Sequence, residues 1–382
     1  MGCKGRRGKQ PTAPPPPPDL PRAKRRKGRR STAEAGAPRA RRGLFRPRLL
    51  NGLFGDPVVY AHLAHQGKAV LFDIGDLGPL WSKALHKLIY VFVSHTHLDH
   101  FFDFDRLLRA EMTFLGQRTT PLVLVGSRGL AERVAARIDS YTWNLLDDPR
   151  PSLLVLELGA RGGRRILRVP FDNGRIVRRA DDAELPGQDL FSLRTATLDH
   201  GGISSLAFGL EERQGFTVRG EALRERKLLP GRWLDRLLDR VRAGGGGMLE
   251  VPGPRGTRRR RVDTLARDLL VPRPGQKLAY VTDAADTPGN RRRAIELCRG
   301  ADWLFIETRY LEREADLALE TGHLTIDAAA DIADEAGAAL VTPMHAAGRY
   351  IDQGSRDFLA ELRARFPRLA LYPDPVRPRA VG

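Results

Sequence analysis

The chain has 382 residues, of which 41% are hydrophobic, and its formal charge at pH 7 is +18. This length and apolar content are typical of a globular body of one or two domains and exclude a chain that is disordered throughout. The two cysteines, Cys3 and Cys298, are too few for a disulfide framework or a thiolate metal site, which favours a reducing compartment. No apolar run approaches membrane-spanning length, so we expect no membrane association, and basic residues after Met1 argue against a secretory signal and for the cytoplasm.

The positive charge is concentrated at the start of the chain. Residues 1–48 hold 16 Lys and Arg against two acidic residues, which accounts for +14 and leaves only +4 for the remainder. Residues 1–45 combine the proline run 14–18 with basic clusters and show no recurring apolar face, so we predict a disordered Pro-, Arg- and Lys-rich tail. This tail is interpreted either as a solvated extension or as an arm that binds a polyanion.

From about residue 50 the pattern alternates between strands and helices, which predicts an α/β fold. The predicted strands are 58–62, 69–72, 89–93, 122–125, 153–156, 166–169, 192–198, 203–210, 277–281, 303–306 and 339–341. The predicted helices are 104–112, 129–138, 233–241, 290–298, a segment capped by Thr325 and ended by Gly337, and 356–365.

Residues 211–275 interrupt this alternation and predict an inserted or projecting element. They contain a basic amphipathic helix with Trp233 and Leu237 on its apolar face, then four glycines, then the basic run 258–261. The basic run is interpreted either as a set of phosphate contacts or as the solvated tip of a hairpin.

A polar cluster follows the predicted strand at 89–93. It contains His95, His97, Asp99 and His100, and we expect these residues to lie on a loop. Imidazole and carboxylate are ligands that suit zinc and similar ions, although a histidine-rich surface loop is the alternative.

Three further ligand-type residues, His200, Asp283 and His345, each follow an apolar β-run. A single histidine at a strand end would be ordinary. Because open α/β sheets gather their sites at strand ends, the repetition predicts one metal centre built from all four segments.

These segments resemble a known family. Residues 94–100, S-H-T-H-L-D-H, are similar to the H-x-H-x-D-H signature of the metallo-β-lactamase superfamily, and residues 71–75 are similar to its upstream Asp–Gly motif. Within that superfamily, residues 199–211, 321–325 and 345–350 resemble motifs of ribonuclease Z, the tRNA 3′-trailer endonuclease. The resemblance covers about residues 50–370.

The resemblance implies a four-layer αβ/βα sandwich, of the α/β (α+β) class, that forms the catalytic domain over residues 46–382. It implies two metal ions, expected to be Zn²⁺ with Mn²⁺ or Fe²⁺ as alternatives because similar ligands accept them. In this resemblance one ion is bound by His95, His97 and His200, the other by Asp99, His100 and His345, and Asp283 bridges the two.

The resemblance also implies roles in catalysis. Asp99 would orient or deprotonate the attacking water, and His323 would protonate the leaving oxygen; the alternative for His323 is a polar residue ahead of the Thr325 cap. Glu307 would orient His323, although Ile306 replaces the histidine that precedes this glutamate in the family. The expected substrate contacts are Arg349, Tyr350, Arg258 and Arg259.

The function implied is that of a hydrolase for tRNA processing, a metal-dependent endoribonuclease that cleaves tRNA precursors at the 3′ end as a homodimer. The chain departs from the family at residues 229–236, where a Gly-Pro-rich, Lys-containing arm is replaced by an amphipathic helix. One alternative is a hydrolase of a small ester, lactone or cyclic phosphodiester. Such an enzyme would not require His323. A second is a non-catalytic nucleic-acid-binding protein, which the complete set of ligand-type residues disfavours.

Overall fold

The computed structural model describes residues 43–113, 121–144, 152–159, 162–171, 177–254, 256–351 and 355–366. The predicted disordered tail lies outside these residues, apart from residues 43–45, which lead into the first strand. Among the described residues, no helix has both the length and the apolar character needed to cross a membrane.

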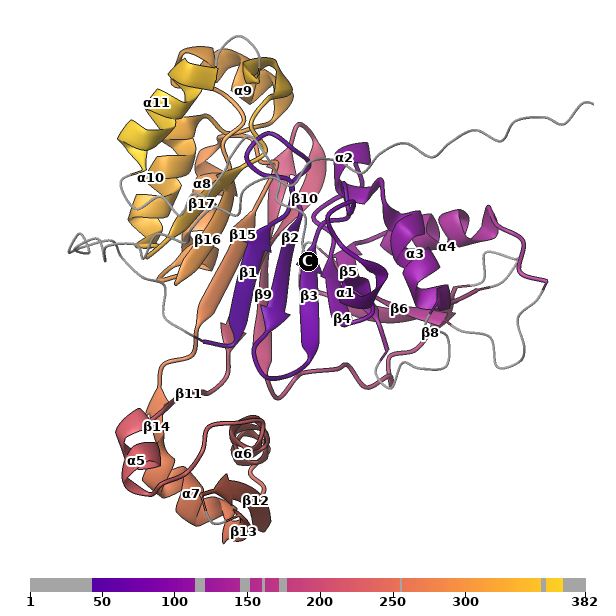
Figure 1. The fold of residues 1–382 in the computed structure, drawn as a ribbon. Coiled ribbons are helices and arrows are strands. Elements are labelled where there is room, and N and C mark those ends of the chain that lie inside the picture. Colours follow the sequence, from indigo (N-terminus) through magenta and orange to yellow (C-terminus); the bar gives the residue numbers. More distant parts are fainter. Residues whose placement is uncertain are drawn as a thin grey trace, which may run out of the picture. The chain divides into compact units, whose positions relative to one another are not determined.

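Two β-sheets form the centre of the body (Figure 1). The first has the strand order β1-β2-β3-β4-β5-β6-β7-β8, and the second has the order β17-β16-β15-β10-β9. The first sheet consists of β1 (Phe45–Leu49), β2 (Val59–Leu63), β3 (Lys68–Phe72), β4 (Leu88–Phe92), β5 (Val123–Ser127), β6 (Ser152–Leu158), β7 (Arg164–Pro170) and β8 (Arg178–Arg179). The second consists of β9 (Phe191–His200), β10 (Ile203–Glu212), β15 (Lys277–Val281), β16 (Trp303–Glu307) and β17 (Val341–Met344).

Helices cover the outer face of each sheet. The first sheet carries α1 (Ser82–Leu85), α3 (Phe104–Thr113) and α4 (Leu130–Asp139), and the second carries α8 (Pro288–Cys298), α10 (Ile326–Ala336) and α11 (Ser355–Arg365) (Figure 1). Separate apolar clusters fill the two helix–sheet interfaces, and a third fills the space between the sheets. The predicted four-layer sandwich is therefore confirmed.

Aromatic side chains hold the two sheets together beneath the site. The Phe72 ring lies 5.1 Å from both Phe92 and Tyr280, and Phe92 lies 5.2 Å from Phe208. Phe72 and Phe92 come from the first sheet and Phe208 and Tyr280 from the second. Such pairs contribute about 0.5–1.5 kcal/mol each beyond the burial of their area, so this cluster fixes the distance between the sheets.

Parallel pairing brings the functional strand ends to one edge of each sheet. β3, β4, β5 and β6 are paired in parallel in the first sheet, and β15, β16 and β17 are paired in parallel in the second. Because Val281 pairs with Ile306 and Ile306 with Pro343, the residues that follow these three strands emerge side by side. The sequence pattern therefore predicts which side chains can meet.

Local signals in the sequence set the ends of α10. The Thr325 hydroxyl accepts a hydrogen bond from the Ala328 N–H, and Gly337 ends the helix at a φ of 64°. These are the N-cap and C-cap predicted from the sequence. The cap matters for the site because His323 lies two residues before Thr325.

Residues 215–273 form what we call the inserted module. It consists of β11 (Gly215–Val218), α5 (Gly220–Glu225), α6 (Trp233–Arg242), β12 (Met248–Gly253), β13 (Gly256–Arg261), α7 (Val262–Leu269) and β14 (Leu270–Arg273). It has its own apolar cluster, in which Trp233 and Leu237 of α6 are buried, so the amphipathic helix packs within the module. The β11–β14 pair leads from β10 into the module and back to β15 (Figure 1).

Polar contacts fix the base of the module. Glu212, at the end of β10, is buried and accepts hydrogen bonds from Arg242 of α6 and Arg273 of β14 at 3.0 and 2.9 Å. The turn between β2 and β3 also contacts α6, where Gln66 donates to Asp239 at 2.5 Å. A buried carboxylate with two guanidinium partners is costly to break, so these contacts restrict the direction in which the module projects.

Candidate metal centre

The polar cluster after β4 is partly helical, so the prediction of a loop is confirmed for His95 and His97 and wrong for Asp99 and His100. Leu98–Phe101 forms the helical turn α2, which carries Asp99 and His100, and His97 is its extended N-cap residue. The His100 N–H donates to the His97 carbonyl, and the His100 carbonyl accepts from Ile74 after β3. The turn therefore aims Asp99 and His100 in a direction that an extended loop would not give them.

Three residues of the site have backbones in the left-handed region. Asp73, Asp283 and His345 have φ angles of 56°, 25° and 62°. Non-glycine residues adopt this region at a cost and do so mainly at functional sites, where the surrounding structure holds them. Here the sharp turn directs each side chain back over the end of its strand.

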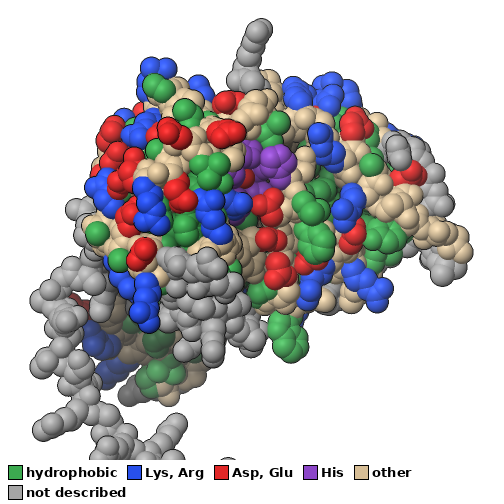
Figure 2. Space-filling model, turned by 90° about the horizontal axis from the view of Figure 1, so that it is seen from above, with side chains coloured by type: hydrophobic (Ala, Val, Ile, Leu, Met, Phe, Trp, Pro, Cys, Tyr) green, Lys and Arg blue, Asp and Glu red, His purple; other side chains and the backbone are tan. Residues whose placement is uncertain are grey.

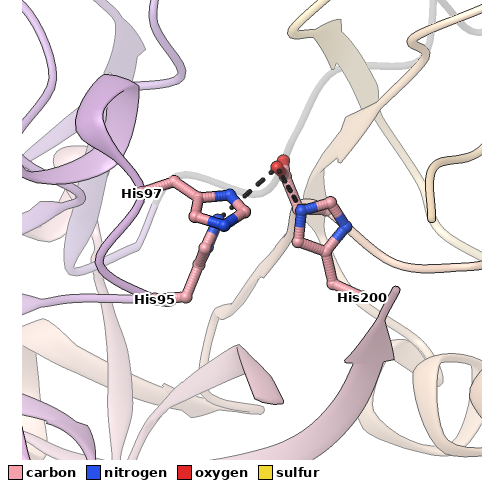
Figure 3. A group of neighbouring side chains, drawn as sticks. His95, His97 and His200 are labelled. Atoms are coloured by element: carbon pink, nitrogen blue, oxygen red, sulfur yellow. Dashed lines mark ion pairs between the residues drawn. The ribbon is translucent and has the colours of Figure 1, made fainter. Parts of the chain in front are cut away.

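Asp283 lies at the centre of the histidines. Its Oδ2 is 3.4 Å from both His200 Nε2 and His100 Nε2 and 3.6 Å from His95 Nε2. Its Oδ1 lies 2.8 Å from His345 Nδ1. Figure 3 shows the rings of His95, His97 and His200 directed toward the carboxylate from two sides.

The ligand-type atoms fall into three overlapping groups, of which two contain the predicted sets and the third consists of Asp283, Glu307, His323 and His345. All seven predicted metal-binding residues are brought together: His95, His97, His200 and Asp283 form one group, and Asp99, His100 and His345 form another. Within each group the donor atoms lie within 4.8 Å of one another. That spacing allows one ion to contact all the donors of a group.

Unsatisfied buried nitrogens show that these residues fit a metal ion. His95 Nε2 and His100 Nε2 are buried and have no hydrogen-bond partner among the described residues. A buried polar atom without a partner is costly, and coordination to a cation would remove that cost. The site is therefore suited to a divalent metal.

The predicted Asp–Gly motif orients His100. Asp73 is fully buried, and its Oδ2 lies 2.8 Å from His100 Nδ1. The carboxylate also accepts hydrogen bonds from the Ser94 N–H, the Ser94 hydroxyl and the Tyr280 hydroxyl. With the Nδ1 proton directed at Asp73, His100 presents Nε2 to the centre, which is the arrangement that supports metal-binding histidines.

Gly322 orients His200 in a similar way. His200 Nδ1 donates to the Gly322 carbonyl at 2.7 Å and so turns Nε2 toward Asp283. Gly322 has a φ of 75°, and an added Cβ would lie 2.6 Å from Gly201 N and 3.0 Å from His200 Nδ1. Only glycine allows the backbone to approach the ring this closely.

The charges of the cluster suit a bound cation. Burial lowers the pKa of His95 to about 2, so that ring stays neutral and keeps a lone pair. Burial also acts against protonation of His345, but the Asp283 carboxylate outweighs it and raises the pKa of His345 to about 9. Asp283 and Asp73 likewise raise the pKa of the buried His100 well above its ordinary value. Positive charge is thus favoured beside Asp283. In the absence of metal it is supplied by protons on His100 and His345, and a bound metal ion would displace those protons.

His323 and Glu307 form a pair at the edge of this cluster. His323 Nδ1 lies 2.9 Å from Glu307 Oε2, and the His323 ring lies 4.8 Å from the His200 ring. Glu307 ends β16, is fully buried, and its Oε1 accepts from the Ala284 and Leu324 N–H groups. The predicted partners therefore meet, even though Ile306 replaces the family histidine.

The predicted substrate contacts are at two separate places. Arg349 is 45% exposed and pairs with Glu314 at 2.6 Å, while Tyr350 is buried and its hydroxyl also contacts Glu314. Arg258 and Arg259 are exposed on β13 of the inserted module. The basic run is thus one strand of the β12–β13 hairpin and not its tip.

Sequence reasoning missed Asn290, which ties two ligand-bearing segments together. Its Nδ2 donates to the carbonyls of Asp199 and Ala285, and its Oδ1 accepts from the Asp199 N–H at 2.9 Å. Asp199 precedes His200, and Ala285 follows Asp283 by two residues. Only its place near the start of a predicted helix was visible in the sequence, and that gave no signal for this role.

We expect Asn290→Ala to weaken metal binding about 10–100-fold, the usual cost of losing a residue that supports metal ligands. The substitution frees both segments without removing a ligand. Titration of the metal-free protein with Zn²⁺ measures the effect. Asn290→Asp keeps the acceptor but loses both donors, so its zinc affinity should lie between those of the unaltered protein and the alanine variant. Unchanged affinity in the alanine variant would show that the clamp has no part in positioning the ligands.

Figure 2 shows histidine side chains reaching the surface, with both acidic and basic side chains on either side of them. Asp99 is the most open of the carboxylates at the centre, with 40% of its side chain exposed, whereas Asp283 is 3% exposed. The centre is thus accessible from this face, with Asp99 at its mouth.

Comparisons with known proteins agree with this geometry. Residues 239–346 match the family described as a beta-lactamase superfamily domain. A Ribonuclease Z of Deinococcus radiodurans is 27% identical over 285 residues, which cover 73% of this chain and 81% of that protein. A Ribonuclease Z of Salinibacter ruber is 29% identical, over 79% of this chain and 82% of that protein.

A Ribonuclease BN of Escherichia coli O1:K1 / APEC is 30% identical over 295 residues, which cover 75% of this chain and 80% of that protein. Identity at this level over most of both chains extends well beyond the motifs of the metal centre. The chain therefore belongs to the ribonuclease Z family of the metallo-β-lactamase superfamily and is a metal-dependent hydrolase with endoribonuclease relatives.

Proposed function

We propose that this protein is a zinc-dependent endoribonuclease that cleaves tRNA precursors at the 3′ end. The observation that carries the proposal is the buried His323–Glu307 pair beside the metal centre. Such a pair can supply a proton to a poor leaving group, which a ribose oxygen is. The names of the curated relatives, Ribonuclease Z and Ribonuclease BN, support RNA as the substrate.

The ligands divide the work at the scissile phosphate. When bound, a pair of divalent ions would supply Lewis acidity toward the phosphoryl oxygens and lower the pKa of a water molecule. Asp283 lies between the two ligand groups, so it is proposed to hold both halves of the centre in register. Asp99 accepts a hydrogen bond from His345 and is the carboxylate most accessible to a substrate or water, so it is proposed to orient the nucleophile.

His323 is proposed to act on the leaving oxygen. Glu307 accepts a hydrogen bond from His323 Nδ1, and two backbone N–H groups hold the Glu307 carboxylate in place. The ring therefore presents Nε2 outward. Glu307 is therefore a positioning residue, since it acts through His323. Cleavage in this direction leaves a 3′-hydroxyl on the mature RNA and a 5′-phosphate on the released trailer.

Contacts farther along the RNA are proposed from two regions. Arg349, stacked at 5.0 Å over the Tyr310 ring and paired with Glu314, is held close to the His323 side of the centre, and the buried Tyr350 supports it. Arg258 and Arg259 on the inserted module would contact phosphates at a distance from the scissile bond. Homodimerisation belongs to the same proposal, and light scattering at twice the mass of one chain would support it.

We expect Arg258→Ala/Arg259→Ala to weaken binding of a tRNA precursor and to flatten its salt dependence. If each arginine contacts one phosphate, the slope of log K against log salt should fall by about 1.4–1.8. Binding measured from low to moderate salt tests this, with Arg356→Ala/Arg363→Ala on α11 as a control that removes the same charge. An equal change in slope for both double variants would show that only net charge matters and not these positions.

The experiment that tests the proposed function uses two substrates side by side. Purified protein of known metal content is incubated with a tRNA precursor carrying a 3′ extension and with a small chromogenic phosphodiester. The expected result is that the purified protein contains zinc and cleaves the precursor at the 3′ end of the tRNA. Hydrolysis of the chromogenic diester with an intact precursor would refute the tRNA substrate and favour the small-substrate alternative.

A further inference from the structure

A second recess adjoins the metal centre on the side away from His323. It is a pocket of about 570 Å³, and His95 and His97 form the wall that it shares with the centre. Its other walls come from the ends of β5 and β6, the start of α4, and the β9–β10 turn. The pocket therefore opens directly onto two of the proposed metal-binding residues.

The chemistry of the lining suits a nucleotide. Leu158 and Ile203 provide apolar surface, and Arg128 and Arg133 provide positive charge, together with the hydroxyls of a few serine and threonine residues. Among the described residues that line it there is no carboxylate. Glu157, next to the lining residue Leu158, is fully buried and accepts hydrogen bonds from the N–H groups of Gly129 and Ala131 and from Arg165. The positive charge of the pocket is therefore not neutralised from within.

Arg128 lies just before α4, and Arg133 lies in its first turn. Both side chains are exposed. Arg133 donates from Nη1 to the Gly129 carbonyl at 3.0 Å, which orients its guanidinium and leaves the other N–H groups available. Glu157 occupies the N-terminal N–H groups of α4, so any anion here would be bound by the two side chains rather than by the helix end. Two guanidiniums that line one pocket are well suited to a phosphate group.

The direction of cleavage decides which nucleotide belongs here. His323 lies beside His200 and His345, at ring distances of 4.8 and 5.9 Å, so the leaving ribose oxygen belongs on that side. The other ester oxygen on the phosphorus carries the nucleoside that becomes the 5′ end of the trailer. That nucleoside must leave the centre in a different direction, and the pocket beyond His95 and His97 lies there.

Resting on the proposed function, we propose that this pocket binds the first nucleotide on the 3′ side of the scissile bond. Leu158 and Ile203 contact its base and sugar, and Arg128 and Arg133 bind the next phosphate along the strand. The RNA has room to continue, because Thr197, Ile203 and Ser204 also line a larger neighbouring pocket of about 1050 Å³. The enzyme would thus hold the trailer as well as the tRNA.

The proposal makes a prediction for small ligands that mimic the released end. Uridine 3′,5′-bisphosphate offers a 5′-phosphate to the metal centre and a 3′-phosphate to the two arginines, whereas uridine 5′-monophosphate lacks the second group. The bisphosphate should bind on the order of tenfold more tightly or better, because hydrogen bonds to charged groups contribute that much. Uridine 3′-monophosphate should bind more weakly than the 5′-monophosphate, since its nucleoside would have to lie on the His323 side.

Calorimetry on the metal-loaded protein measures all three affinities. In Arg128→Ala/Arg133→Ala the advantage of the bisphosphate over the 5′-monophosphate should disappear, and in Arg356→Ala/Arg363→Ala on α11 it should remain. Metal content and melting temperature confirm that each variant is folded. A bisphosphate that binds no better than the monophosphate in the unaltered protein would overturn the proposal, as would an advantage that survives loss of both arginines.

These outcomes are separate from those that decide the proposed function. If the tRNA precursor stays intact while the bisphosphate preference depends on Arg128 and Arg133, the substrate is wrong but the nucleotide pocket stands. If the precursor is cleaved and the preference is absent, the function stands and the pocket proposal fails.

Discussion

Asp283→Ala is expected to abolish hydrolysis of both RNA and a simple phosphodiester. Removal of a single group that stabilises charge in a transition state commonly costs about 10²–10³ in kcat, and this carboxylate faces four histidines of both ligand groups. Its loss would also leave the protonated forms of His100 and His345 without their main partner. We therefore expect a loss of turnover at or beyond the upper end of that range, together with loss of bound metal.

The measurement combines initial rates with metal analysis of the same sample. Asp334→Ala, which removes an exposed carboxylate from α10, is the matched control and should keep both activity and metal. Asp283→Asn preserves the volume of the side chain, so it separates loss of charge from a cavity. Unaltered turnover in the alanine variant would contradict the assignment of Asp283 as the bridging ligand.

Residue types and their spacing were enough to predict the α/β alternation and the gathering of ligand-type residues at strand ends, whereas the four-layer sandwich and the division of the ligands into two sets came from the family resemblance. Apolar runs that end in His200, Asp283 and His345 place these residues at strand ends, and parallel pairing then brings the ends together. The cap at Thr325 and the stop at Gly337 were visible for the same reason, because each depends on one residue and its immediate neighbours.

What could not be predicted depends on contacts between distant segments. The helical turn at Asp99 and His100 is fixed by the backbone of Ile74, a partner that no local pattern indicates. Asn290 clamps Asp199 and Ala285, and it lies 91 residues after Asp199 in the chain. Asparagine is equally common at the start of a helix without such a role. The strand β1 was also missed: Arg46 and Arg48 alternate with buried residues, but Pro47 at its centre is unusual in a strand and the two arginines continue the basic composition of the preceding tail.

The same limit applies to the inserted module. The amphipathic pattern of α6 predicts that its apolar face is covered, but not whether the body, the module or an RNA covers it. The structure places Trp233 and Leu237 in a core that belongs to the module. The basic residues Arg258 and Arg259 of β13 are exposed, so they, and not the apolar face of α6, are the part of the module proposed to contact a polyanion.

His323→Ala is expected to slow RNA cleavage by about 10²–10⁴-fold, the range for loss of a general acid. A ribose oxygen leaves poorly without a proton, whereas a nitrophenolate leaves readily without one. The same substitution should therefore cost a chromogenic diester much less. Comparison of the two substrates gives a ratio that separates proton donation from general damage to the site.

The Glu307 link makes this test sharper. Glu307→Gln removes the charge that orients His323 Nδ1 while preserving the size of the buried side chain, and the glutamine side-chain oxygen can still accept from the Ala284 N–H. If Glu307 acts through His323, it should show the same preference for the chromogenic substrate, with a smaller loss on RNA. The double variant should then be no slower on RNA than His323→Ala alone, since residues that act as a unit are not additive. Additive losses, or equal losses on both substrates, would place His323 among the groups that shape the centre rather than as the acid for the leaving oxygen.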